Sequence, residues 1–229
     1  ILITTKSGNK SRGVGVEVNN NLTGTRFVDE RDYQYVYGQG SQGVKPTNIV
    51  DANATAEASW GAKIDGSDAV NSFGNTYKYV GNKDNYKNFF ETGLTNQSSI
   101  ALMGANDKGN FRLGVSNLYL NSNIPNSDMK QQGLNFNTTY NVTPKLQFTL
   151  TANYMFENVL NRASFSHAPV NLVASHQFIA NTYVIRWLKA RKDANRNELL
   201  PVDQDIYFET PYFIAYDDLN KTSRNRLTA

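Results

Sequence analysis

Alternation of apolar and polar residues marks several stretches of the chain. The clearest is LNFNTTYNV at 134–142, where Leu134, Phe136 and Tyr140 alternate with asparagine and threonine. Because successive side chains of a β-strand point to opposite faces, this stretch predicts a strand with one apolar and one polar face. Similar patterns occur at 12–22, 94–104, 110–120 and 145–156, and residues 221–229 begin a sixth. The sequence therefore predicts an all-β, antiparallel fold.

The predicted strands are long, and their connections are uneven. Runs of about 9–13 residues exceed the ~5–6 residues of most globular strands and match a tilted strand that spans a membrane. Residues 106–109 and 143–145 form short turns, whereas residues 25–92 and 158–219 form long connections. Short periplasmic turns and longer extracellular loops are typical of outer-membrane β-barrels. Loops this long are uncommon in compact soluble domains, so the pattern favours a membrane barrel over a soluble β-sandwich.

Composition excludes several classes of protein. The formal net charge is +3, and the basic residues are scattered, so no nucleic-acid partner is expected. The absence of cysteine excludes disulfides and thiolate metal sites. No apolar run approaches the ~20 residues of a membrane-spanning helix. The mean hydropathy of −0.53 does not decide between membrane and solvent, because half of the strand residues in a membrane barrel face water.

Two short patterns resemble enzyme motifs but have structural interpretations. Ser127 and Lys130 match the S-x-x-K pattern of serine acyl-enzymes, yet they fall in a predicted hairpin loop without the companion motifs. Gly38, Gly40 and Gly43 follow no apolar strand and precede no Lys-Ser/Thr pair, so they do not form a phosphate cradle. We expect these glycines to allow positive φ angles in a compact loop.

Metal binding is not expected either. His167 and His176 lack a Glu-x-x-His partner. The carboxylates of Asp203, Asp205 and the 217–218 pair could bind Ca²⁺ with backbone carbonyls, but their spacing fits no EF-hand loop. A helix is predicted after Pro169, over residues 170–192, because apolar residues recur there at helical spacing and the stretch ends in Lys and Arg. This helix either caps its own loop or docks a partner.

Several strings resemble the SusC/RagA family of TonB-dependent outer-membrane transporters. They are ILITTKSG at the start, then SWGAKIDG, NFFETGLTNQSSIALMGANDKGNFRLGVSNL, IPNSDMK and TPYFIAYDDLNKTSRNRLTA, in the family's order. The resemblance is dense through residues 60–160 and thin across 161–205. It implies that residues 1–8 end a plug domain and that residues 13–229 form the first five to six strands of a barrel of about 22 strands.

The resemblance also implies a function. Members import oligosaccharides or peptides across the outer membrane of Gram-negative, Bacteroidetes-type cells, energised by the TonB-ExbB-ExbD complex acting through the plug. A SusD-like surface lipoprotein is the expected partner, and outer-membrane lipid surrounds the barrel. No catalytic residue and no cofactor is implied. Polar side chains that face the lumen and aromatic side chains of the loops would contact substrate, although the resemblance identifies no individual substrate-binding residue.

The sequence departs from the family pattern in what it lacks. It contains no signal peptide, no TonB box, almost no plug and no later strands. Five or six strands are fewer than the eight of the smallest single-chain bacterial barrels, and an open sheet edge in lipid leaves backbone groups unsatisfied. We therefore expect the sequence to be part of a longer chain. Two other functions stay open: a SusC-like receptor or assembly component that imports nothing, and a soluble β-rich glycan-binding module.

Overall fold

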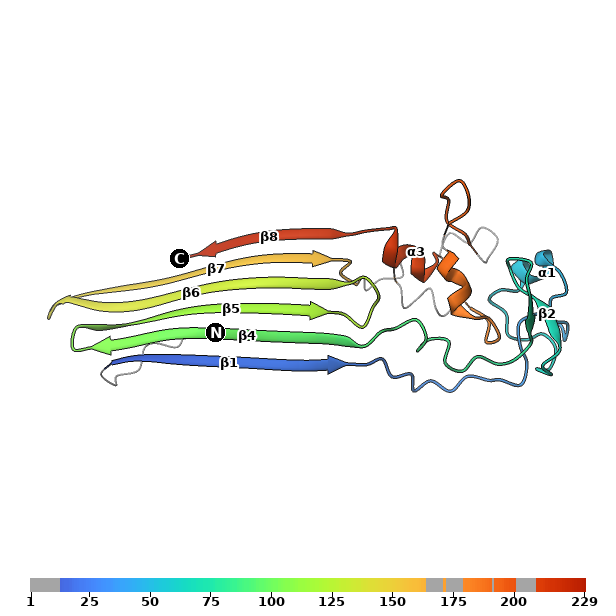
Figure 1. Cartoon of the computed structure of the whole chain (residues 1–229), viewed down its shortest axis with the longest axis horizontal. Coiled ribbons are helices and arrows are strands. Elements are labelled where there is room, and N and C mark those ends of the chain that lie inside the picture. The colour runs from blue at the N-terminus through green and yellow to red at the C-terminus, as the bar shows by residue number, and fades with distance from the viewer. Residues whose placement is uncertain (1–12, 164–170, 172–178, 191, 201–208) are drawn as a thin grey trace.

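The computed structural model describes residues 13–163, 171, 179–190, 192–200 and 209–229. Its main feature is a six-stranded antiparallel sheet in the order β1-β4-β5-β6-β7-β8 (Figure 1). The strands are β1 (Gly13–Thr25), β4 (Gly93–Asn106), β5 (Gly109–Asn121), β6 (Asp128–Thr143), β7 (Leu146–Leu160) and β8 (Lys221–Thr228). This confirms the predicted antiparallel β fold, and the strands run past the predicted stretches at several ends.

Two tight turns join β4 to β5 and β6 to β7 at the same end of the sheet (Figure 1). In the first, the side-chain Oδ1 of Asn106 accepts the backbone N–H groups of Lys108 and Gly109, each at 2.9 Å. In the second, Thr143 Oγ1 accepts the N–H of Lys145 at 3.3 Å. Asparagine and threonine favour such turns because their side chains can replace a backbone acceptor.

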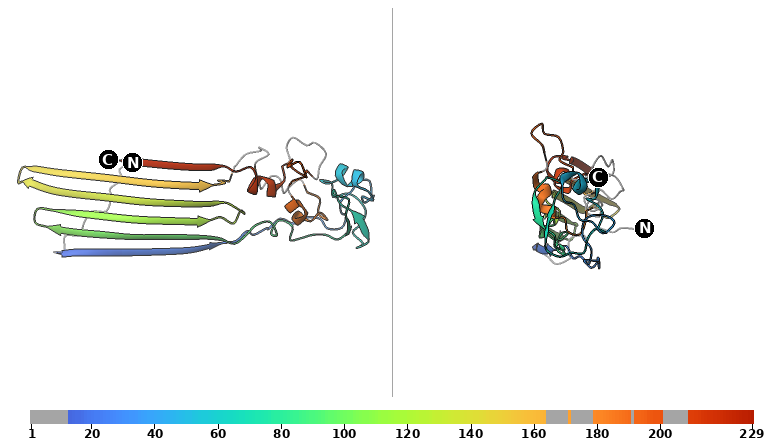
Figure 2. Two further views of the ribbon diagram at one scale, coloured as in Figure 1. Left: turned by 45° about the horizontal axis from the view of Figure 1, so that its top comes forward. Right: turned by 90° about the vertical axis from the view of Figure 1, so that its right-hand side faces the viewer.

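The two long connections contain short elements of their own. The first, residues 26–92, holds α1 (Ile49–Ala54) and the small hairpin of β2 (Asp68–Val70) with β3 (Thr76–Lys78). The second runs between β7 and β8 and holds the 3₁₀ helix η2 (Ile185–Ala190) and α3 (Pro211–Tyr216). We call the described parts of both connections, residues 26–92, 179–190, 192–200 and 209–219, the loop unit. In Figures 1 and 2 it lies beyond the strand ends opposite the tight turns.

The loop unit has a hydrophobic core to which both long connections contribute. Its fully or nearly buried members are Phe89, Ala180, Tyr183, Ile185, Leu188, Tyr212, Ile214 and Ala215. Backbone hydrogen bonds also join the two connections: Asn82 N–H donates to Asn181 O at 2.8 Å, and Ala180 N–H donates to Ala56 O at 2.8 Å. Two segments about 100 residues apart in the sequence therefore fold together.

The helix predicted over residues 170–192 is wrong for the part that the structure describes. Among the described residues between 179 and 192, only η2 is helical. The helices α1 and α3 were not predicted. The reason lies in the backbone donors of Ala180, Asn181 and Ile185. They bond to Ala56 O, Ser59 Oγ and Asn85 Oδ1, respectively, so they make no intrahelical bonds. The apolar residues at helical spacing fill the core from an irregular backbone instead.

The sheet, in contrast, forms a single layer (Figure 2). Its apolar residues remain exposed, with Val18 at 67% and Leu134 at 44% of their surface accessible. The outer edge of β1 has no strand partner among the described residues, nor has the outer edge of β8. Within the described residues, no helix combines the length and the apolar character needed to cross a membrane. The predicted end of a plug, residues 1–8, lies outside the described residues.

Candidate functional site: the two sheet faces and the loop unit

One face of the sheet carries apolar side chains in continuous rows. Because the strands pair in register, residues that stand opposite one another share a face. One row crosses all six strands: Val18, Ile100, Val115, Leu134, Tyr154 and Leu227. The next row toward the tight turns consists of Val16, Leu102, Leu113, Phe136 and Ala152. Neither row contains a charged or amide side chain, and together they form the centre of what we call the apolar face.

The same face becomes polar toward the loop unit. The row beyond Val18 consists of Asn20, Ser98, Asn117, Gln132, Phe156 and Asn225. Asn20 Nδ2 donates to Asn96 Oδ1 at 3.0 Å and to Ser98 Oγ at 2.9 Å. Tyr154 OH donates to Asn225 Oδ1 at 2.7 Å. The apolar face is therefore a band with a sharp edge, and the strands continue beyond it.

The opposite face is polar along most of its length, and we call it the polar face. Hydroxyl and amide side chains dominate it: Asn19, Asn135, Asn137, Asn153, Ser99, Ser116 and Thr151. It also holds an ion pair across β4, in which Arg112 Nη2 lies 3.2 Å from Glu17 Oε2. Near the loop end, Glu157 accepts from Arg162 Nη2 at 3.2 Å. Charged groups thus gather on one face and are absent from the centre of the other.

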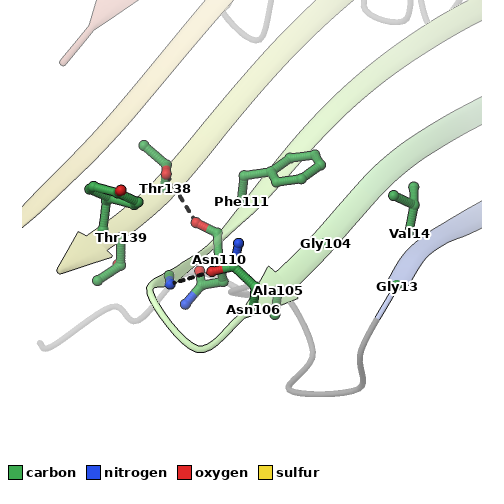
Figure 3. A pocket seen from close by; sticks show the side chains of 11 residues that line it. Gly13, Val14, Gly104, Ala105, Asn106, Asn110, Phe111, Thr138 and Thr139 are labelled. Atoms are coloured by element: carbon green, nitrogen blue, oxygen red, sulfur yellow. Dashed lines mark hydrogen bonds between the residues drawn. The ribbon is translucent and has the colours of Figure 1, made fainter. Parts of the chain in front are cut away.

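A hollow of about 350 Å³ lies at the turn end of the sheet (Figure 3). In Figure 3, Gly104 on β4 lies between Val14 on β1 and Phe111 on β5. A Cβ at Gly104 would come within 2.7 Å of the Phe111 ring, so only glycine leaves room for that ring. Thr138 Oγ1 donates to Asn110 O at 2.9 Å. No charged side chain lines this hollow.

Aromatic side chains in the loop unit line two further hollows that share Tyr33 and Tyr35. One, of about 370 Å³, is lined by the charged residues Asp29, Arg31, Asp32 and Lys83 as well as Val36. The other, of about 160 Å³, is lined by Tyr86, by several amide residues and by Glu57, among others. The Tyr33 and Tyr86 rings are parallel, with centroids 6.0 Å apart, and the Arg31 guanidinium lies 3.9 Å from the Tyr86 centroid. Tyr33 and Tyr86 thus form a parallel aromatic pair that lines the smaller hollow.

Electrostatics hold this aromatic group in one charge state. The hydrogen bond from Arg31 Nε to Asp29 Oδ1, 2.7 Å long, lowers the pKa of the Asp29 carboxyl. The same bond raises the pKa of Arg31. Burial raises the pKa of Tyr86 well above its usual value. At neutral pH Arg31 and Asp29 are therefore a fixed ion pair, and Tyr86 presents a neutral phenol.

Ser127 does not form a nucleophile with Lys130. Its side chain is buried, and its hydroxyl donates to Asn161 O at 2.9 Å. Lys130 lies on β6, with its ammonium 5.8 Å from the centroid of the Tyr119 ring. Ser127 therefore ties the β5–β6 connection to the end of β7, whereas Lys130 lies in β6 and not in the predicted hairpin loop.

The glycine prediction is confirmed at two of its three positions. Gly40 has φ of 130° and Gly43 has φ of 77°, which other residues rarely adopt. Gly38 serves a different purpose, since a Cβ there would lie 2.5 Å from Thr182 Cγ2 and 2.6 Å from the Tyr79 ring. That packing allows Tyr79 OH to donate to Gln39 O at 2.6 Å, and burial raises the pKa of Tyr79 to about 12.

The residues considered for metal binding do not come together among the described residues. His167, His176, Asp203 and Asp205 lie outside them. Asp217 forms an ion pair with Lys192 Nζ at 2.5 Å. Within the described part of the chain, no group of three or more His, Asp or Glu residues could hold a metal ion.

The aromatic hollows were not predicted as a site. The tyrosines at positions 33, 35 and 37 alternate within the first long connection, and this is the one local signal that the sequence offers. Distant segments of the chain supply the residues that pack around these tyrosines, namely 82–86 and 179–181.

No protein family model matches the sequence, and no curated protein matches it either.

Proposed function

We propose that the protein is a TonB-dependent outer-membrane importer of the SusC/RagA type, which takes up oligosaccharides or peptides together with a SusD-like surface lipoprotein. The observation that carries this proposal is the exposed apolar face of a sheet whose opposite face is polar. A soluble protein would bury such a face against a second layer. In a membrane barrel it contacts lipid, and the polar face lines the lumen.

The dimensions of the apolar face support a lipid partner. On β7 the apolar side chains of this face extend from Leu146 to Phe156, which stands in the row where the other strands become polar. This is a length of about 33 Å at ~3.3 Å per residue. A strand tilt of about 40° reduces this to a height of about 25 Å, which is the height of the apolar band of outer-membrane barrels. On this proposal the outer edges of β1 and β8 pair with further strands, in a barrel of about 22 strands whose lumen is plugged.

The proposed orientation follows from the connections. The tight turns at residues 106–109 and 143–145 face the periplasm, and the loop unit lies on the extracellular side. There it can contact both the substrate and the surface lipoprotein. The TonB-ExbB-ExbD complex would act on a plug, and the residues described here supply the wall and part of the outer vestibule.

The test is uptake by living cells. We expect cells that lack the protein to lose uptake of a fluorescent oligosaccharide or peptide that wild-type cells accumulate, and a protonophore or deletion of TonB to have the same effect. Re-expression should restore uptake. Recovery of the protein in the soluble fraction would instead favour a soluble glycan-binding module. An outer-membrane location with unchanged uptake would favour a receptor or assembly component that imports nothing.

A further inference from the structure

The smaller hollow of the loop unit has the construction of a ligand subsite, and we call it the amide groove. Its volume is about 160 Å³, and its lining includes Tyr33, Tyr35, Asn82, Asn85, Tyr86 and Asn181, together with the carboxylate residue Glu57. This is smaller than the roughly 300–1,000 Å³ of pockets that enclose a whole drug-sized ligand. The amide groove is therefore the size of one ring-sized unit of a longer molecule.

The amides of the groove are held rigidly by the protein. Asn82 Nδ2 donates to Asn85 Oδ1 at 3.0 Å, and the same Oδ1 accepts Ile185 N–H at 2.7 Å. Asn181 Nδ2 donates to Gln34 O and to Tyr37 O, each at 2.8 Å. These bonds orient all three amides before any ligand arrives, which reduces the entropy that binding would cost.

Each of these amides keeps one group without a partner among the described residues. Asn82 Oδ1 and Asn181 Oδ1 are acceptors, and Asn85 Nδ2 is a donor. Asn181 Oδ1 is buried, so the groups open to a ligand are Asn82 Oδ1 and Asn85 Nδ2. A hydroxyl both donates and accepts, and neighbouring hydroxyls can therefore satisfy a mixed set of amide donors and acceptors.

Aromatic rings complete this arrangement. Tyr33 is 39% exposed, so part of its ring is available to a ligand while its parallel contact with Tyr86 holds it in place. The faces of such rings are apolar, and the C–H groups of a pyranose ring present a complementary apolar surface. Aromatic faces beside fixed amides suit a molecule that has C–H groups on one side and hydroxyls around its edge.

The neighbouring charged hollow indicates a neutral ligand that continues past the tyrosines. It shares Tyr33 and Tyr35 with the amide groove and is lined by two carboxylates and two cationic groups. Asp29 is already paired with Arg31 at 2.7 Å. Because the charges balance, this hollow offers no net attraction for an anionic or cationic unit.

We infer that the amide groove binds one pyranose unit of a neutral oligosaccharide, with the next unit over Tyr33 and Tyr35 toward the charged hollow. The inference deepens the proposed function and rests on it, because the ligand is the imported substrate. In one recurring mode of peptide recognition, an extended peptide is held by main-chain hydrogen bonds along an exposed sheet edge. The amide groove is lined by side chains from separate irregular segments, and a saccharide fits it better.

The experiment is calorimetric titration of the protein purified from its own cells. The probes are neutral hexasaccharides of glucose, mannose and xylose, and uncharged hexapeptides as the alternative. We expect at least one hexasaccharide to bind. Tyr33→Ala should weaken its binding about five- to tenfold through loss of the aromatic face. Asn85→Asp should weaken it about tenfold, because it removes the free donor while keeping the Oδ1 that holds Ile185 N–H.

Matched controls separate binding from folding. Trp60→Ala removes an aromatic side chain that is 67% exposed and lies outside the amide groove, so it should change binding less than about twofold. Tyr33→Phe keeps the ring and should retain most of the affinity. Equal losses in Tyr33→Ala and Trp60→Ala, or no loss in both groove variants, would overturn the inference.

The outcomes also separate this inference from the proposed function. If hexapeptides bind and are imported while no hexasaccharide binds, the importer stands and the saccharide subsite is wrong. If a hexasaccharide binds through Tyr33 and Asn85 but cells import nothing, the subsite stands and the proposed import fails. Absence of binding by every hexasaccharide also overturns the subsite.

Discussion

The sheet and the loop unit are stabilised in different ways. The loop unit has a hydrophobic core of its own. Four large side chains in it are at most 2% exposed: Phe89, Tyr183, Ile185 and Leu188. In the sheet, apolar residues such as Val16 and Phe148 keep 66% and 52% of their surface exposed. Backbone hydrogen bonds between neighbouring strands hold the sheet together, while side-chain packing holds the loop unit together.

This difference indicates where each region obtains its stability. The loop unit carries its hydrophobic partners within the described residues, so its fold depends on contacts between its two connections. The sheet exposes an ordered apolar face that is far larger than scattered surface residues would produce. It therefore requires an apolar partner outside the described residues, and lipid is the partner that we propose. Three predictions test this comparison.

The largest effect should follow from Phe89→Ala in the loop unit. Phe89 is 2% exposed, and its ring lies edge-on to Phe90 and Tyr212, with centroids 5.3 and 5.1 Å away. Its removal leaves a cavity that should cost about 3–5 kcal/mol. Peptide-resolved hydrogen exchange should show faster exchange across the loop unit and unchanged exchange in β4–β7.

Val50→Ala is the control for that variant. Val50 is 72% exposed on α1, so its truncation should change the free energy of unfolding by less than about 0.5 kcal/mol. Faster exchange throughout the sheet in Phe89→Ala would mean that the two regions unfold as one, and the distinction drawn above would be wrong.

A somewhat smaller effect is expected from Leu150→Arg in β7. Leu150 stands opposite Thr138 on the apolar face, and an arginine facing lipid near the midplane costs about 2–4 kcal/mol. The neighbouring Thr149→Arg points to the polar face and is the matched control. Heat-modifiability on gels should show impaired assembly for Leu150→Arg and near-normal assembly for Thr149→Arg, whereas equal tolerance would exclude lipid as the partner.

The smallest effect concerns pH and Glu198 in the loop unit. Burial raises the pKa of this carboxyl, while its Oε1 accepts the N–H of Thr210. Because the pKa of Glu198 in the folded state lies above the unfolded value of 4.5, the carboxyl stays protonated to higher pH in the folded state than in the unfolded state. This stabilising contribution is complete below about pH 4.5 and is lost as the pH rises through the raised pKa.

Glu198→Gln provides the measurement. It keeps an oxygen acceptor for Thr210 and removes the ionisation, so the urea midpoint of the loop unit should rise at pH 7 and match wild type near pH 4. Asp29 acts with the opposite sign, because Arg31 lowers its pKa. Its contribution is present above pH 3.8 and is lost as the pH falls. A wild-type midpoint that increases from pH 4.5 to 7 would contradict the assignment to Glu198.

The sequence predicted the sheet well because strand formation depends on a local pattern. The alternation at 134–142 identified β6, although the strand begins earlier, at Asp128, where the pattern is weaker. The short turns were predictable for a similar reason, since Asn106 and Thr143 accept hydrogen bonds from backbone groups two or three residues away. The residues that stand opposite one another on strands joined by a tight turn were predictable as well, because the length of the turn sets the register of the two strands.

The loop unit was largely unpredictable, and so was the amide groove. The apolar spacing of residues 179–188 suggested a helix, but the backbone of this segment bonds to residues 56, 59 and 85. Long-range bonds of this kind override local periodicity. The alternating tyrosines at positions 33, 35 and 37 were visible in the sequence, yet nothing local indicates that Tyr33 would meet Tyr86.

The sequence by itself thus determined the strands, their two faces and the turns, because each depends on residues within a few positions of one another. The tertiary structure decided which distant segments form the loop core, and it brought Tyr33, Asn85 and Asn181 to one groove. It also decided that the apolar face stays uncovered by the described residues. The physical reason is that long-range packing depends on loop closure between distant segments, and no local pattern of side chains specifies its outcome.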